Sequence, residues 1–157
     1  MLEQIFIYFT IDIIYLWLNI GVIPFWLVLL FFPSSKICSF FVSSIFPIII
    51  FSAVYLYLIY FFFVSDYDFS SNFSLYLSID NISDLFSDKT FLMMFWTHFI
   101  CVNLFTGGWI VKDSQKFSIN KILMIFPLLI TYLIGPLGLF IYWLIRIFHA
   151  KSISLYD

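Results

Sequence analysis

Four apolar stretches, each long enough to cross a lipid bilayer as a helix, dominate this chain and limit what it can fold into. They run over Ile5–Phe32, Ile45–Val64, Phe91–Val111 and Ile122–Ile145. A helix needs about 20 predominantly apolar residues to cross the hydrocarbon core of a bilayer. Of the 157 residues, 64% are hydrophobic and 10% are charged, whereas a soluble domain carries about 25% charged residues. The sequence therefore predicts an all-α integral membrane protein.

The segments between these stretches predict the topology. The links from first to second and from third to fourth stretch are short, and they contain Pro33 and Lys112, which resist a buried helix. Each pair of stretches is therefore expected to form an antiparallel hairpin. The long connection between the pairs alternates apolar and polar residues and then reads DNISDLFSDK, which favours a short helix lying on the bilayer surface. We expect four transmembrane helices in two hairpins, with this interfacial helix between them, in a single transmembrane domain over residues 1–157.

Charge and metal-ligand content exclude several classes of function. The net charge of −2 provides no basic patch, so nucleic acid is not an expected partner. The expected partner is membrane lipid, because the apolar stretches are long enough to cross a bilayer. Cys38 and Cys101 are interpreted as free thiols that pack as small hydrophobic groups. His98 and Cys101 would supply only two soft ligands, and His149 lies beyond the last apolar stretch. Neither a metal site nor a bound cofactor is therefore predicted.

Polar residues inside the apolar stretches are the candidate functional residues, because ionisable groups within a membrane cost at least a few kcal/mol. Asp12 and His98 each lie seven residues inside a stretch, on the order of 10 Å deep at a helical rise of about 1.5 Å per residue. Asn19, Asn103 and Gly135 lie at roughly 16–21 Å by the same arithmetic. Polar groups from the first, third and fourth stretches thus gather at two depths, as expected of a site built between helices.

Helical phase divides these residues among faces. Asp12, Asn19 and Trp26 follow one another at seven-residue spacing, and Trp96 and Asn103 share a second face. Pro136 leaves the carbonyl of Tyr132 without its helical partner, and Asn103 is a donor able to satisfy it. The predicted binding residues are Asn19, Trp26, Trp96, Asn103, Gly135, Pro136 and Tyr142.

Each of these residues also has a structural interpretation. Asp12 lies at headgroup level if the first helix begins near Ile13. Asn19 and Asn103 are also explained by hydrogen bonds between helices, which contribute about 0.6 kcal/mol on average. His98 is also explained as a packing residue.

The second half of the chain resembles a known family. FWTHFICVNLFTGGWIVKD followed by FPLLITYLIGPLGLFIYWLIR is similar to the abscisic-acid-deficient-4-like family, which includes plant neoxanthin synthases. The matching positions are Trp96, His98, Leu104, Phe105, Gly107, Lys112, Asp113, Pro127, Gly135, Pro136, Gly138, Leu139 and Arg146. The first stretch shares Asn, Trp and Pro at seven-residue spacing, as Asn19, Trp26 and Pro33. Where the family has aspartate, this chain has Asn103.

The resemblance implies a carotenoid-linked role, because plant members are associated with the isomerisation of violaxanthin to neoxanthin. That reaction needs an acid for the epoxide oxygen and a base for a vinylic proton, but no redox cofactor. His98 is the expected acid or base, with Asp12 or Asp113 as its partner. An amide cannot exchange protons usefully, so Asn103 either shifts this chemistry onto His98 or favours a role without catalysis.

Two hypotheses follow for the function. The first is a cofactor-independent isomerase acting on a carotenoid or isoprenoid. The second is a non-enzymatic membrane module that binds a carotenoid, a lipid or partner helices, including a second copy of the chain. A transporter is disfavoured, because the sequence contains no evident inverted repeat.

Overall fold

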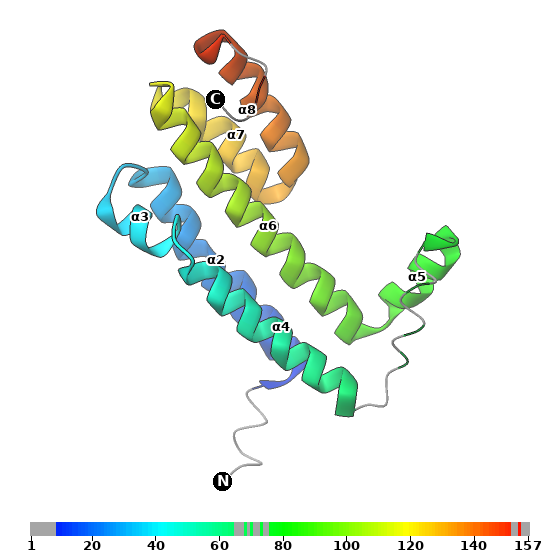
Figure 1. Ribbon diagram of the computed structural model, residues 1–157. Coiled ribbons are helices and arrows are strands. Elements are labelled where there is room, and N and C mark those ends of the chain that lie inside the picture. Colours follow the sequence, from blue (N-terminus) through cyan, green and yellow to red (C-terminus); the bar gives the residue numbers. More distant parts are fainter. Residues whose placement is uncertain are drawn as a thin grey trace. The chain divides into compact units, whose positions relative to one another are not determined.

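The computed structural model describes residues 9–64, 68, 70, 73, 76–151 and 154, and all their regular structure is helical (Figure 1). The helices are α2 (Ile11–Phe31), α3 (Lys36–Phe41), α4 (Phe46–Val64), α5 (Ile79–Ser87), α6 (Lys89–Lys116), α7 (Lys121–Leu133) and α8 (Gly135–Ala150). The prediction of an all-α protein is therefore confirmed.

Three helical segments are long and apolar enough to cross a membrane: Ile11–Phe31, Lys36–Val64 and Lys89–Lys116. The first corresponds to the predicted stretch Ile5–Phe32, whose residues 5–8 lie outside the described part of the chain. The last segment extends beyond the predicted stretch Phe91–Val111 at both ends. After Val111, the residues up to Lys116 include no proline or glycine, so the helix continues to Lys116. By length and composition, these segments indicate a membrane protein.

The fourth predicted stretch, Ile122–Ile145, is not one continuous helix, and this corrects the sequence-based expectation. It is divided at Ile134, whose φ of −141° and ψ of 85° are not helical. Pro136 explains the division, since its ring removes one helical hydrogen bond and clashes with the preceding turn. Proline is tolerated in the first turn of a helix, where α8 places it. The resulting helices of 13 and 16 residues are shorter than the usual 20-residue span, so the four-span topology stays a prediction.

The described residues divide into two compact units. Those within Met1–Gly21 and Ile48–Phe99 form the first unit, and those within Val22–Pro47 and Ile100–Asp157 form the second. The first unit buries Leu18, Leu58 and Met93, and the second buries Leu29, Leu104 and Leu128. The prediction of a single domain over the whole chain stays a prediction.

In the second unit, α7 and α8 pack closely. Helices α7 and α8 lie against each other (Figure 1), and the Thr131 backbone occupies the space that a side chain at Gly138 would need. Lys121 Nζ also donates to the Phe31 carbonyl at 2.8 Å, and Gln115 Nε2 donates to the Pro33 carbonyl at 2.9 Å. These bonds satisfy carbonyls at and just beyond the end of α2, where helical partners run out.

Helix α5 is short and amphipathic. Ser78 caps it by accepting from the Asn81 amide at 3.1 Å, and Asp88 in turn caps α6 by accepting from the Phe91 amide at 2.7 Å. The Phe86 ring packs on Phe95, with 4.8 Å between ring centroids. These contacts hold α5 at the first turns of α6.

Candidate functional site

The most deeply buried charges of the second unit form a cluster between α6 and α8. Asp113 Oδ2 accepts from Arg146 Nε at 2.8 Å and from the Tyr142 hydroxyl at 2.7 Å. The side chains of Arg146 and Asp113 are 0% and 8% exposed, and Tyr142 is fully buried. The sequence predicted Asp113 and Tyr142 as functional residues, and the structure brings them together.

Arg146 has further partners in this cluster. Its Nη1 donates to the Ser154 carbonyl at 2.6 Å, and its guanidinium lies over the Phe117 ring, 4.6 Å from the centroid. The carboxylate of Asp113 is thus held by a cation and a phenol, which suits a link between α6 and α8 better than a base acting on a bound molecule. Arg146 was missed as a pairing residue, although a cation within an apolar helix is a signal for a buried partner.

A second polar position lies where α7 and α8 are divided. Asn103 is 4% exposed, and its Oδ1 occupies the space that a Cβ at Gly135 would fill. The proposed bond from Asn103 to the Tyr132 carbonyl is not formed. In the described part of the chain, Asn103 Nδ2 is buried without a hydrogen-bond partner. The structure therefore brings Asn103 beside Gly135, which the sequence analysis grouped with it by depth, but not through the expected bond.

Trp26 also belongs to the second unit, where it is 4% exposed. Its ring lies so close to Gly107 that a Cβ there would come within 2.8 Å of it. It also meets the Tyr132 ring edge-on, with 5.3 Å between centroids. Trp26 is therefore a packing residue between α2, α6 and α7 in this unit.

Asn19 and Trp96 form a pair in the first unit. Trp96 Nε1 donates to Asn19 Oδ1 at 3.3 Å, and Asn19 Nδ2 donates to the Tyr15 carbonyl at 2.7 Å. The asparagine is thus satisfied within α2 and by α6. This pair joins two predicted binding residues, while Asn103 belongs to the other unit.

Two of the residues predicted to be catalytic, Asp12 and His98, lie in the first unit, and both are exposed there. Asp12 lies 3.9 Å from Lys89 Nζ in an exposed ion pair, with both side chains more than three-quarters exposed. His98 is exposed on α6, and no hydrogen bond to another described residue reaches its imidazole. No three His, Cys, Asp or Glu side chains among the described residues gather closely enough to hold a metal ion.

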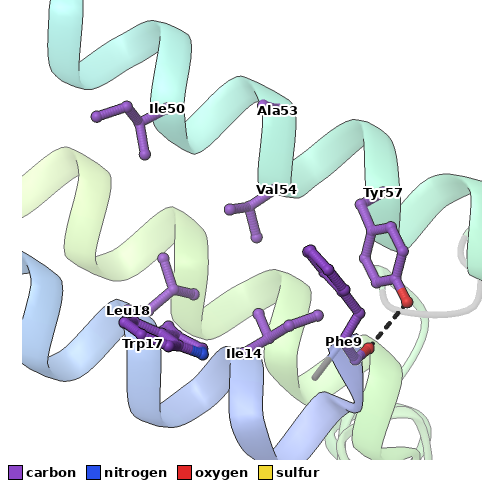
Figure 2. Close-up of a pocket in the computed structure, with 8 residues that line it drawn as sticks. All are labelled: Phe9, Ile14, Trp17, Leu18, Ile50, Ala53, Val54 and Tyr57. Carbon is purple, nitrogen blue, oxygen red and sulfur yellow. Dashed lines mark hydrogen bonds between the residues drawn. The ribbon is translucent and has the colours of Figure 1, made fainter. Parts of the chain in front are cut away.

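An apolar cavity of about 560 Å³ lies in the first unit between α2 and α4 (Figure 2). Ile14 and Leu18 face Val54 across it, and the Tyr57 hydroxyl donates to the Phe9 carbonyl at 2.8 Å at one end (Figure 2). Its lining consists of Phe9, Ile14, Trp17, Leu18, Ile50, Ala53, Val54 and Tyr57. None of these side chains is charged, and Phe9 and Trp17 are exposed, so the cavity is a groove open at the surface. We refer to it as the α2–α4 groove.

The sequence did not predict the α2–α4 groove. Its lining is aromatic and aliphatic, and such residues are indistinguishable from packing residues in a chain with 23 Phe, 10 Tyr and 5 Trp. The available signal was Ser52-Ala53, the only pair of small residues in the bulky sequence of α4. Small residues leave space beside a neighbouring helix, which here becomes part of the groove.

Comparison with family models matches residues 13–142 to the family described as ABA DEFICIENT 4-like. Comparisons with curated proteins and with solved structures find no match. The matched range runs from the first turn of α2 to the middle of α8. It includes the Asn19–Trp96 pair, the division at Ile134 and both Asp113 and Tyr142. The chain belongs to the ABA DEFICIENT 4-like family.

Proposed function

We propose that this chain binds a long, neutral, apolar molecule of the carotenoid or isoprenoid class in the α2–α4 groove. The observation that supports this most directly is the groove itself: about 560 Å³ of space lined by eight residues without a charge. Ligand cavities for small molecules typically measure about 300–1,000 Å³ and are lined by hydrophobic and aromatic side chains. A charged ligand would lose its hydration here without gaining a partner.

The chemistry of the lining supports a polyene or isoprenoid chain. The rings of Phe9, Trp17 and Tyr57 offer flat apolar faces, which pack well against a planar conjugated chain. Helices α2 and α4 both belong to segments able to cross a membrane, so a molecule dissolved in lipid has direct access to the groove. The family resemblance implies the same class of ligand.

Filling the groove tests this proposal. We expect the tagged full-length protein, purified from a host that makes carotenoids and isoprenoid quinones, to retain one of these molecules. Ala53→Phe places a ring in the groove and is expected to reduce the retained ligand to background. Ser52→Phe adds the same ring at the neighbouring exposed position and is expected to leave retention unchanged. Chromatography of solvent extracts measures both. Equal retention by the two variants, or no ligand in the unmodified protein, would contradict the proposal.

Acid–base isomerisation of such a ligand is the second candidate, favoured by membership of the family. Asp113 is engaged by Tyr142 and Arg146, and Asp12 is paired with Lys89. Of the three predicted catalytic residues, only His98 has no polar partner among the described residues of its own chain, so it is the candidate for proton transfer. We expect His98→Ala to abolish conversion of an epoxy-carotenoid, and Asn103→Asp, which restores the family residue, to increase it. A pigment profile that neither variant changes would exclude this candidate and leave binding alone.

We further propose that α5 rests on the bilayer surface. Its apolar side includes Ile79, which is 80% exposed, and Ile82, whereas Asp80 and Asp84 lie on the other side. Because α5 is held at the first turns of α6, a membrane-spanning α6 would place it at the interface. A fluorescent probe at Ile79 should report an apolar environment in vesicles, whereas a probe at Asp84 should report water. The same signal from both positions would argue against this location.

A further inference from the structure

His98 occupies an unusual position on a helix able to cross the membrane. It follows Lys89, the first residue of α6, by nine residues, which corresponds to about 13–14 Å along the helix axis. Lys112 follows it at roughly 21 Å by the same rise. These lysines mark the two ends of the apolar part of α6, so His98 lies within the hydrocarbon layer of a spanning helix.

The imidazole nevertheless faces outward from its own chain. His98 is exposed, and no other described residue is hydrogen-bonded to it. An ionisable side chain at membrane depth is costly and almost always faces a protein interior or pairs with another polar group. Lipid offers no hydrogen bonds at this depth. The exposed face of α6 is therefore expected to be covered by protein rather than by lipid.

A second copy of this chain is the partner that fits this face. Two copies inserted in the same direction, related by a two-fold axis along the membrane normal, place equal residues at equal depth. A neutral imidazole has one donor and one acceptor nitrogen, so it is complementary to another imidazole. Phe95, which is 47% exposed, lies three residues before His98 on the same side of α6, and Leu92, which is 44% exposed, lies three residues before Phe95 at the edge of that side.

We propose that Leu92, Phe95 and His98 form the interface of a parallel homodimer, in which His98 bonds to His98 of the partner subunit. Helix association in membranes relies on side-chain packing and on interhelical hydrogen bonds of this kind. The α2–α4 groove is lined by residues of α2 and α4 and by Phe9, and by none of α6. The dimer therefore leaves the groove accessible, and the proposal does not depend on ligand binding.

Disulfide cross-linking in native membranes tests this arrangement. In a Cys38→Ala, Cys101→Ala background, we expect His98→Cys to form a dimer under a mild oxidant. The matched control is Leu56→Cys, on the outer side of α4 and 69% exposed, which should remain monomeric. No cross-link at position 98, or an equal yield at both positions, would overturn the proposal.

A second measurement uses the protein with its natural cysteines. In lipid nanodiscs or mild detergent, we expect His98→Ala to weaken dimer association by about threefold or more, the effect of losing one average interhelical hydrogen bond. His98→Asn, whose amide also donates and accepts, should retain most of the association. A dimer fraction that His98→Ala leaves unchanged would contradict the proposal, whatever the state of the groove.

Discussion

A fully buried guanidinium is stable only where its charge is compensated, and in this chain Arg146 depends on Asp113. The two are joined at 2.8 Å and are 0% and 8% exposed, so water does little to screen either charge. Removal of one partner from such a pair leaves an uncompensated buried charge, which costs about 3–5 kcal/mol. The cluster with Tyr142 is therefore expected to decide whether α8 stays docked on α6 in the second unit.

Asp113→Asn is expected to lower the free energy of unfolding by about 3 kcal/mol or more, because Arg146 keeps its charge and loses the carboxylate. Thermal unfolding in detergent, followed by circular dichroism, measures the change. The double variant Asp113→Leu with Arg146→Leu removes both charges and should cost less than Asp113→Asn alone.

The exposed pair of Asp12 and Lys89 is the control for this prediction. Lys89→Met should change the stability by no more than about 1 kcal/mol, because both side chains are open to solvent. Equal losses for Lys89→Met and Asp113→Asn would show that burial does not set the strength of these ion pairs.

At the scale of elements, the break between α7 and α8 controls how closely these helices approach. Ile134 leaves the helical conformation before Pro136, and the chain then resumes as α8. The absence of a side chain at Gly138 allows the Thr131 backbone to lie against it. Helix α6, which contains no proline, continues without such a break over 28 residues.

Gly138→Ala is therefore expected to destabilise the protein by about 1–3 kcal/mol, because the new methyl group would overlap the Thr131 backbone. Gly21→Ala is the matched control, since nothing lies within 4 Å of a Cβ at that position. Alanine is a better helix former than glycine, so Gly21→Ala should raise stability by roughly 0.5–1 kcal/mol. Unfolding of both variants under identical detergent conditions tests the pair, and a similar sign for both would refute the close-approach argument.

At the scale of the whole molecule, the outer surfaces of the long helices are apolar. Trp17, Leu56 and Phe105 are each about two-thirds exposed, and all three lie in segments able to cross a membrane. Apolar side chains exposed along such segments are stable in lipid, where they cost no hydrophobic free energy. The chain is thus built to be solvated by lipid rather than by water.

We expect the protein to remain in the membrane fraction after washing with alkaline carbonate and with 1 M salt (about a 3 Å Debye length), and to be released only by detergent. Salt and alkali weaken electrostatic attachment but not apolar contacts with lipid. Fractionation followed by immunoblotting of a tagged chain measures this. Release of the protein by salt alone would indicate attachment through surface charge instead.

Much of the architecture can be predicted from the sequence, because a membrane imposes simple requirements. Long apolar runs must become helices, since the backbone finds no other hydrogen-bond partners in lipid, and this determines the class of the fold. Depth along a helix follows from a fixed rise, so Asn103 could be expected beside Gly135 and Pro136, and the family motif could be found in the same residues. The break at Pro136 has a local cause, although its consequence, two short helices in place of one span, was not predicted.

Pairing, exposure and empty space depend on tertiary packing. Asp113 was expected, as an alternative to Asp12, to be the partner of His98, but it follows His98 by about 22 Å along the same helix. It bonds to Arg146 and Tyr142 instead, because the docking of α8 on α6 decides which side chains meet. The exposure of His98 and the α2–α4 groove likewise follow from how neighbouring helices approach, which residue types in so aromatic a chain do not reveal. The sequence alone determined that the chain forms apolar helices and which polar residues fall within them. Only the tertiary structure decided which of those residues are satisfied within the chain and which face outward, because that depends on contacts between residues distant in sequence.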